Sequence, residues 1–246
     1  MMSDRTQGTG GVDDAALDYY LIFATPDDRG RGAPPLGILV EEFVLCDDYT
    51  AAGIDSVEWS SATGVWGGSS ATDAWSGSSA TSRDLRTDAL LRSRVIPVTR
   101  LDAGDAYQAC GGGELPPEAE IRALFRERQP LPAAAPLDLG ATGARRYRVL
   151  FAGELGERGL GNVRSALRLE PVDDPMGRVV GSATATAAGH DFTWELRRIG
   201  PGIAWCLDVT VRLGTGPESA VGALLHHHRQ AIRGQGLIPV TIERFA

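Results

Sequence analysis

Two neighbouring stretches decide the fold: DFTWELRRI (Asp191–Ile199) and IAWCLDVTVRL (Ile203–Leu213). In the first, two aromatic residues and a leucine alternate with polar residues, and in the second an apolar residue stands at every other position. Successive side chains of a strand point to opposite faces, so this alternation predicts two strands with one buried and one polar face. The Gly-Pro-Gly turn between them favours an antiparallel pair.

The rest of the second half fits the same sheet. A helix over Gly216–Arg233 is expected, with a capping box of Thr215 and Glu218 and an apolar stripe that includes His228. A meander of antiparallel strands, one helix and a last strand is typical of a two-layer α+β domain. The further strands expected are Tyr147–Leu155, Val163–Val172, Arg178–Ala187 and Leu237–Phe245.

The first half predicts a similar domain. PDDRGRGAPP (Pro26–Pro35), which is rich in glycine and proline, is interpreted as a loop. Strands are expected at Leu17–Ala24, Leu36–Leu45, Ser56–Trp59 and Val95–Thr99, and helices at Ser82–Arg94, Leu101–Cys110 and Leu115–Arg128.

We therefore expect an α+β protein of two domains, each a mainly antiparallel sheet with a helix packed on one face. The predicted order is a flexible tail (1–14), an N-terminal domain (15–130), a Pro/Ala-rich linker (131–145) and a C-terminal domain (146–246).

A tandem duplication is a further hypothesis, because the halves open on YYLIFA and YRVLFA and both end in a strand with Ile-Pro-Val-Thr. It requires the same strand order in both halves, and chance likeness of short apolar strands is the alternative.

Composition excludes several functions. The 246 residues carry a net charge of −8, which argues against sequence-independent binding to nucleic acid or to anionic membranes. All 24 basic residues are arginine, so Schiff-base lysine catalysis and a P-loop lysine are ruled out. No signal peptide or membrane span is visible, and the three cysteines show no disulfide or zinc spacing, so a cytoplasmic location is expected.

The segment 59–82 repeats SSAT three times with a nine-residue period and contains Trp59, Trp66 and Trp75. An odd period places successive tryptophans on opposite faces of a strand, so no regular element presents them together. One interpretation is an expanded loop without function, since longer loops cost little closure entropy. A second is a flexible arm whose tryptophans bind a partner protein, and a third is a hairpin folded onto its own domain.

Candidate chemistry is sparse. The adjacent His226, His227 and His228 cannot converge on one ion from a helix, so no metal site is expected, and His228 is interpreted as a packed core residue. The glycine-rich run Ala152–Asn162 lacks the G-x-G-x-x-G order and is interpreted as a hairpin loop. No cofactor is predicted.

The polar face of the C-terminal sheet is the remaining candidate. It carries Arg197 and Arg212 beside four possible catalytic residues. Three of them, Cys206, His190 and Asp208, could act as nucleophile, base and acid. The alternative is an ordinary solvated sheet face with cross-strand Glu/Arg pairs. The four are Cys206, His190, Asp208 and Glu195.

The leading functional hypothesis is a non-catalytic protein-binding or adaptor module that uses the 59–82 arm or this polar face. One alternative is a small-molecule enzyme or carrier with its site near Cys206, Glu195 and Asp208. Another is a structural homo-oligomer that assembles through the edge at Leu237–Phe245.

Overall fold

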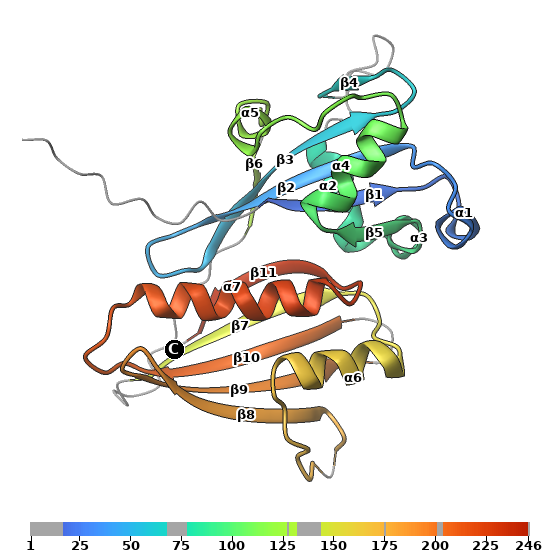
Figure 1. Ribbon diagram of the computed structural model, residues 1–246. Coiled ribbons are helices and arrows are strands. Elements are labelled where there is room, and N and C mark those ends of the chain that lie inside the picture. Colours follow the sequence, from blue (N-terminus) through green and yellow to red (C-terminus); the bar gives the residue numbers. More distant parts are fainter. Residues whose placement is uncertain are drawn as a thin grey trace, which may run out of the picture.

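The chain folds into two antiparallel sheets with helices packed alongside, which confirms the predicted α+β class (Figure 1). The computed structural model describes residues 17–67, 78–126, 128–131, 144–174, 176–200 and 204–245. The predicted tail and most of the predicted linker lie outside these residues, so the proposed domain boundaries stay predictions.

Sheet A belongs to the first half of the chain. Its strands follow the order β4-β3-β2-β1-β5, and β6 pairs with another part of β3. The strands are β1 (Asp18–Ile22), β2 (Gly37–Leu45), β3 (Ala51–Ser60), β4 (Val65–Trp66), β5 (Val95–Val98) and β6 (Arg128–Pro130).

Helices cover sheet A on both faces, whereas one covered face was expected. On one face, Tyr19 and Trp59 pack against α4 (Arg100–Ala109) and α5 (Glu118–Arg122). On the other, Tyr20 and Leu39 pack against α2 (Ser78–Thr87) and α3 (Ala89–Ser93). Both faces are buried because β1 and β2 carry apolar side chains at successive positions, as strands between two layers do.

Sheet B belongs to the second half and has the order β11-β7-β10-β9-β8. Its inner face, which includes Trp194, Trp205 and Leu207, packs against α6 (Glu157–Ala166) and α7 (Ser219–Arg233), as the alternation predicts. The strands are β7 (Ala144–Ala152), β8 (Val179–Ala187), β9 (His190–Ile199), β10 (Ala204–Arg212) and β11 (Ile238–Arg244).

Two segments interpreted as loop or strand are helices. The glycine-rich run after β7 forms α6, because Leu160, Val163 and Leu167 recur at helical spacing and pack on the core of sheet B. The segment PDDRGR forms α1 (Pro26–Arg31), where Thr25 and Asp28 make a capping box. Local capping and tertiary packing outweigh the low helix propensity of glycine in both places.

The predicted helix ends also need correction. The helix expected at Ser82–Arg94 is divided into α2 and α3, because Asp88 adopts an extended conformation and caps α3 by accepting a hydrogen bond from the Leu90 N–H. The capping box of Thr215 and Glu218 does not form, since Glu218 is itself the N-cap of α7 and makes no side-chain cap bond.

The strand orders differ between the sheets, which does not support a duplication of the whole domain. In both halves the first strand pairs antiparallel with the Ile-Pro-Val strand, as β1 with β5 and β7 with β11. The other neighbour of the first strand is the second strand in sheet A and the fourth in sheet B. The likeness is therefore limited to this pair of strands.

Helix α7 joins the two sheets. It lies between them in Figure 1, and its apolar stripe, which includes Val221, Leu225 and Ile232, packs on sheet B. Its other side carries Arg229 and Arg233, which are buried against sheet A. One helix thus completes the packing of both units.

A cluster of buried charges occupies this interface. Asp18 of β1 accepts a hydrogen bond from Gln230 at 2.6 Å and lies 3.2 Å from Arg229 and 3.5 Å from Arg233. Arg233 also donates to the Tyr19 and Val98 carbonyls. Beside it, on the same side of sheet A, Glu41 of β2 and Arg86 of α2 form a buried bidentate pair with N–O distances of 2.9 and 2.8 Å.

The first prediction concerns Asp18, whose removal would leave two buried guanidinium groups without their carboxylate. We expect Asp18→Ala to lower the free energy of unfolding by about 3–5 kcal/mol in urea titrations. Asp27→Ala is the matched control, because Asp27 pairs with Arg31 on the exposed surface of α1 and should cost less than about 1 kcal/mol. Equal losses in the two variants would contradict a role for the buried cluster.

The second prediction concerns acid stability. Burial opposes ionisation of Asp18, but Arg229, Arg233 and Gln230 outweigh it, so the pKa of Asp18 lies below its ordinary value. The stabilisation is therefore complete above the unfolded pKa of about 3.9 and is lost as the pH falls toward the folded pKa. The free energy of unfolding should fall more steeply below about pH 4 in the natural chain than in Asp18→Asn. Parallel curves would refute this assignment.

Candidate functional site

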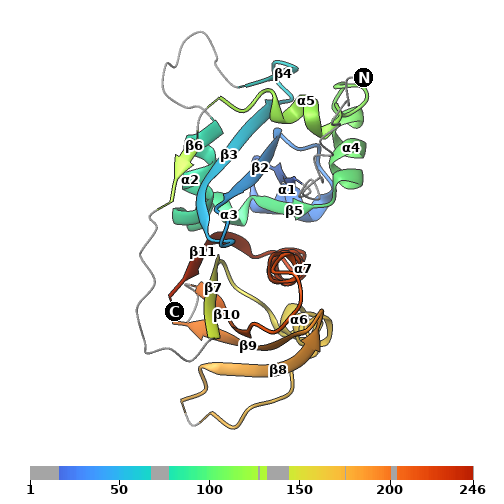
Figure 2. The same ribbon diagram turned by 90° about the vertical axis from the view of Figure 1, so that its left-hand side faces the viewer.

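The outer face of sheet B is the surface that brings most of the predicted site residues together. Helices α6 and α7 both lie against the inner side of this sheet (Figure 2). The residues that alternate with the core residues along its strands face the opposite side. We call this surface the outer face. It includes Arg146, Arg148, Thr193, Glu195, Arg197, Cys206, Asp208, Thr210 and Arg212.

Asp208 lies at the centre of the outer face. Its carboxylate accepts hydrogen bonds from Arg148 at 2.6 and 2.9 Å and from Arg197 at 3.3 Å. Glu195 stands directly opposite Asp208 on β9, and the Arg148 guanidinium lies 5.0 Å from the Phe245 ring centroid. This is a cross-strand charge network, in which opposite charges on neighbouring strands pair.

Cys206 lies next to this network but lacks the properties of a nucleophile. Its exposed fraction is 2%, although it points toward the outer face. Burial, followed by the negative charge of Asp208, raises the pKa of the thiol to about 11. The thiol is therefore protonated at neutral pH, whereas catalysis requires the thiolate.

His190 is too far from Cys206 to serve as its base, so the hypothesis of a Cys206–His190–Asp208 arrangement is wrong. Cys206 stands opposite Arg197, and His190 precedes Arg197 by seven positions on β9. At about 3.3 Å per residue, the two side chains are roughly 23 Å apart.

His190 has a structural role instead. Its Nδ1 accepts a hydrogen bond from the Gly214 N–H at 3.0 Å, and its Nε2 lies 3.0 Å from the Pro217 carbonyl. A ring that accepts at Nδ1 and donates at Nε2 is neutral. His190 thereby holds the 214–217 loop against the β8–β9 turn. This loop needs glycine, since a Cβ on Gly216 would lie 1.6 Å from the Ala188 carbonyl oxygen.

Trp59 and Trp66, the two described tryptophans of the repeat, do not lie on a free arm. Trp59 is fully buried in β3 and packs edge-on against Tyr107 at a centroid distance of 4.7 Å. Trp66 is half-buried in β4, where its Nε1 donates to the Tyr107 hydroxyl at 3.2 Å. Both belong to a hairpin folded onto its own unit, which removes Trp59 from the partner-binding candidates. Trp75 lies outside the described residues.

The other sequence candidates have simple positions. His228 is buried, as expected, and its ring packs against Trp194 at 4.7 Å, while His227 is exposed. Arg212 is exposed at the end of β10, opposite Asp191. All three cysteines are free. The residues that the structure describes contain neither a cluster of side chains arranged to hold a metal ion nor a helix long and apolar enough to cross a membrane.

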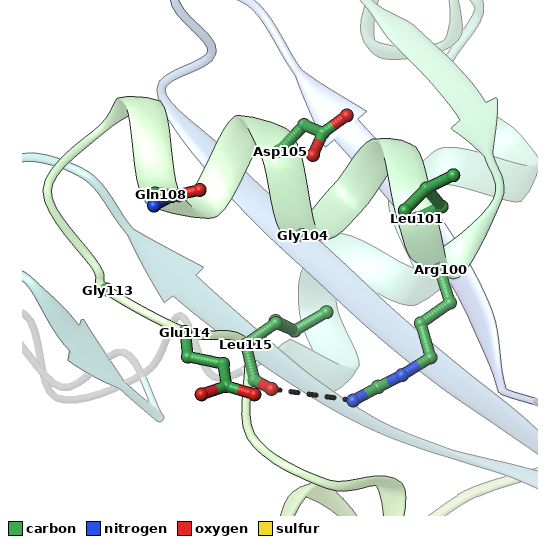
Figure 3. A pocket seen from close by; sticks show the side chains of 8 residues that line it. All are labelled: Arg100, Leu101, Gly104, Asp105, Gln108, Gly113, Glu114 and Leu115. Carbon is green, nitrogen blue, oxygen red and sulfur yellow. Dashed lines mark hydrogen bonds between the residues drawn. The ribbon is translucent and has the colours of Figure 1, made fainter.

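An open pocket of about 640 Å³ lies along α4, away from the outer face (Figure 3). Its one basic group, Arg100, is already engaged, because it donates at 2.6 Å to both the Tyr19 hydroxyl and the Pro116 carbonyl. Asp105, Gln108 and Glu114 are spread along the rim without converging on a common point. The pocket therefore contains no set of polar side chains arranged around one ligand, and no pattern in the sequence indicated this pocket.

Comparison with protein-family models, curated proteins and solved structures finds no match to this chain. What the site can do therefore rests on its own geometry. The outer face offers an extended polar surface with paired charges and a protonated, buried thiol, which suits contact with another macromolecule better than covalent chemistry.

The third prediction tests the state of the thiols. With iodoacetamide at neutral pH, Cys46, which is exposed, should be alkylated, whereas Cys206 should react only after unfolding. Mass spectrometry of peptides from native and urea-unfolded protein measures both. Rapid alkylation of Cys206 in the native protein would show a reactive thiolate and favour the alternative hypothesis of a small-molecule enzyme.

Proposed function

We propose that this protein is a non-catalytic protein-binding module that contacts its partner through the outer face of sheet B. The observation that carries the proposal is that no described helix covers the outer face (Figure 2). Of the candidate catalytic residues, Asp208 is bound by Arg148 and Arg197, and His190 lies off this face and holds the 214–217 loop. A small-molecule enzyme would need these residues to line a cavity. The pocket described above lies on α4 and contains none of them.

The composition of the outer face supports a protein partner. Arginines and carboxylates occur together on it, so it has no large field of one sign, as nucleic acid or anionic lipid would require. Arginine and aromatic residues contribute most to protein–protein binding energy, and the Arg148–Phe245 pair offers both at the rim. Exposed arginines at positions 146 and 212 can provide further charge complementarity.

The fourth prediction is tested by affinity capture from the native host with quantitative mass spectrometry. The double variant Arg146→Glu/Arg212→Glu should lose the proteins that the natural chain retains, because it reverses two exposed charges of the outer face. The control Arg29→Glu/Arg83→Glu changes net charge equally on the exposed surface of α1 and α2 and should retain them.

A third variant that lacks residues 68–77 tests the repeat separately, without removing β4 or α2. Loss of the same partners only in this deletion would move the binding site to the repeat. Retention by the outer-face variant would refute the proposal.

A further inference from the structure

The edge strand β8 is the open end of sheet B. The opposite edge, β11, faces the N-terminal unit, where Ile238 packs with Tyr20, Leu39 and Leu85. The N-terminal unit thus packs at the start of the Leu237–Phe245 edge, which the sequence hypothesis assigned to homo-oligomer assembly. β8 instead runs along the end of the molecule remote from the N-terminal unit (Figures 1 and 2).

The first part of the β8 edge is capped by the chain itself. The Val180 carbonyl accepts hydrogen bonds from the Arg164 guanidinium at 2.9 and 3.2 Å. Ser182 exchanges two backbone hydrogen bonds with Glu170, at 2.8 and 3.0 Å. Backbone N–H and C=O groups alternate in direction along a strand. Those of Thr184 and Thr186 therefore point away from β9, as those of Ser182 do.

The second part of the edge is open. Among the residues that the structure describes, no group bonds the backbone N–H or C=O of Thr184 and Thr186, and residues 184–187 are exposed. The stretch 182–187 also lacks charges, proline and bulges, which are the features that usually protect an edge strand from pairing.

We propose that two copies of the chain pair through β8, antiparallel and about a two-fold axis at Ala185. This register places Thr184 opposite Thr186 of the second copy, and the reverse, so every free backbone group of both edges gains a partner. If the two-fold axis lay at Thr184 instead, Thr186 would have to pair with Ser182 of the second copy, whose backbone groups already bond Glu170. If the axis lay at Thr186, Thr184 would have to pair with Ala188 of the second copy, which lies in the turn after β8 with φ +49°.

The ends of the free edge fit a copy of the same strand. After Ala187 the chain turns back toward β9 through Ala188 and Gly189, both with positive φ. In the proposed register this turn falls where the Glu170–Ser182 bridge of the second copy begins. The open stretch thus has the length of the strand that would fill it, which is the observation that favours a second copy over an unrelated segment.

The side chains around the axis are compatible with self-pairing. Thr184 and Thr186 stand beside Thr193 and Asp191 on the outer face, so the joined sheets would carry rows of threonine across the axis. Ala183, Ala185 and Ala187 lie on the inner face, where their small side chains allow close approach. No like charges meet between the two edges.

The fifth prediction is that the unmodified 246-residue chain sediments as a dimer of twice 26.1 kDa, in a concentration-dependent equilibrium. Thr184→Pro removes a backbone N–H that points away from β9, so the fold should persist while the dimer is lost. Thr184→Ala keeps this N–H and is the matched control, which should still dimerise. Circular dichroism verifies folding of both variants.

Charge variants distinguish a second copy from any other partner. Ala185→Lys and Ala185→Glu each bring like charges together on the two-fold axis, so each alone should be monomeric. An equimolar mixture should restore the dimer, because lysine then faces glutamate. An unrelated strand would not give this reciprocal rescue.

Cross-linking tests the register. In a Cys46→Ser background, Ala185→Cys should form a disulfide-linked dimer on mild oxidation, because a directly opposed pair has Cα atoms about 4.5 Å apart. Ala187→Cys is equally exposed but faces Ala183 of the second copy, so it should not cross-link. A monomer at all concentrations overturns the proposal, as does a dimer unaffected by Thr184→Pro, an absence of charge rescue, or equal cross-linking at both positions.

Discussion

The buried charge cluster between the sheets is the interaction on which the rest of the structure depends. It contains three arginines, Arg86, Arg229 and Arg233, and two carboxylates, Asp18 and Glu41. Arginine faces lie over the Phe43 and Tyr20 rings at 4.7 Å, which adds cation–π attraction to the ion pairs. Buried charges gain little net stability when paired but cost much when unpaired, so the cluster selects one docking of the two units.

This docking determines which surfaces stay available. It covers the β11 edge and one face of sheet A, and α4 and α5 cover the other face. Among the described residues, no helix covers the outer face of sheet B, and no strand pairs with the outer edge of β8 at residues 184–187. Both remaining surfaces are built from strands with regular backbone geometry, which favours recognition by shape and hydrogen bonding. Of the catalytic candidates, Cys206 is a buried thiol with a raised pKa, and His190 holds the 214–217 loop through its ring nitrogens.

Period-two alternation made the strands of sheet B predictable, because Trp205, Leu207 and Val209 repeat without interruption. The same pattern fixed the residues of the outer face. Helices α1 and α6 were missed because capping by Thr25 and packing of Val163 outweigh nearby glycines. The pairing of Asp18 with Arg229 could not be predicted, since nothing local relates positions so distant in the chain. The separation of Cys206 from His190 likewise depends on strand register.

Helix α7 has a consequence for the order in which the chain folds. Its Arg233 contacts Tyr19, 214 positions earlier in the sequence. The carboxylate of Asp18 therefore has neither of its arginine partners until α7 has been synthesised. Helices α2 and α3 can cover their part of this face earlier, but the region around Asp18 stays exposed to water until then. Contacts of such long range slow folding. On the ribosome, the first half of this chain would remain a substrate for chaperones until the second half arrives to close it.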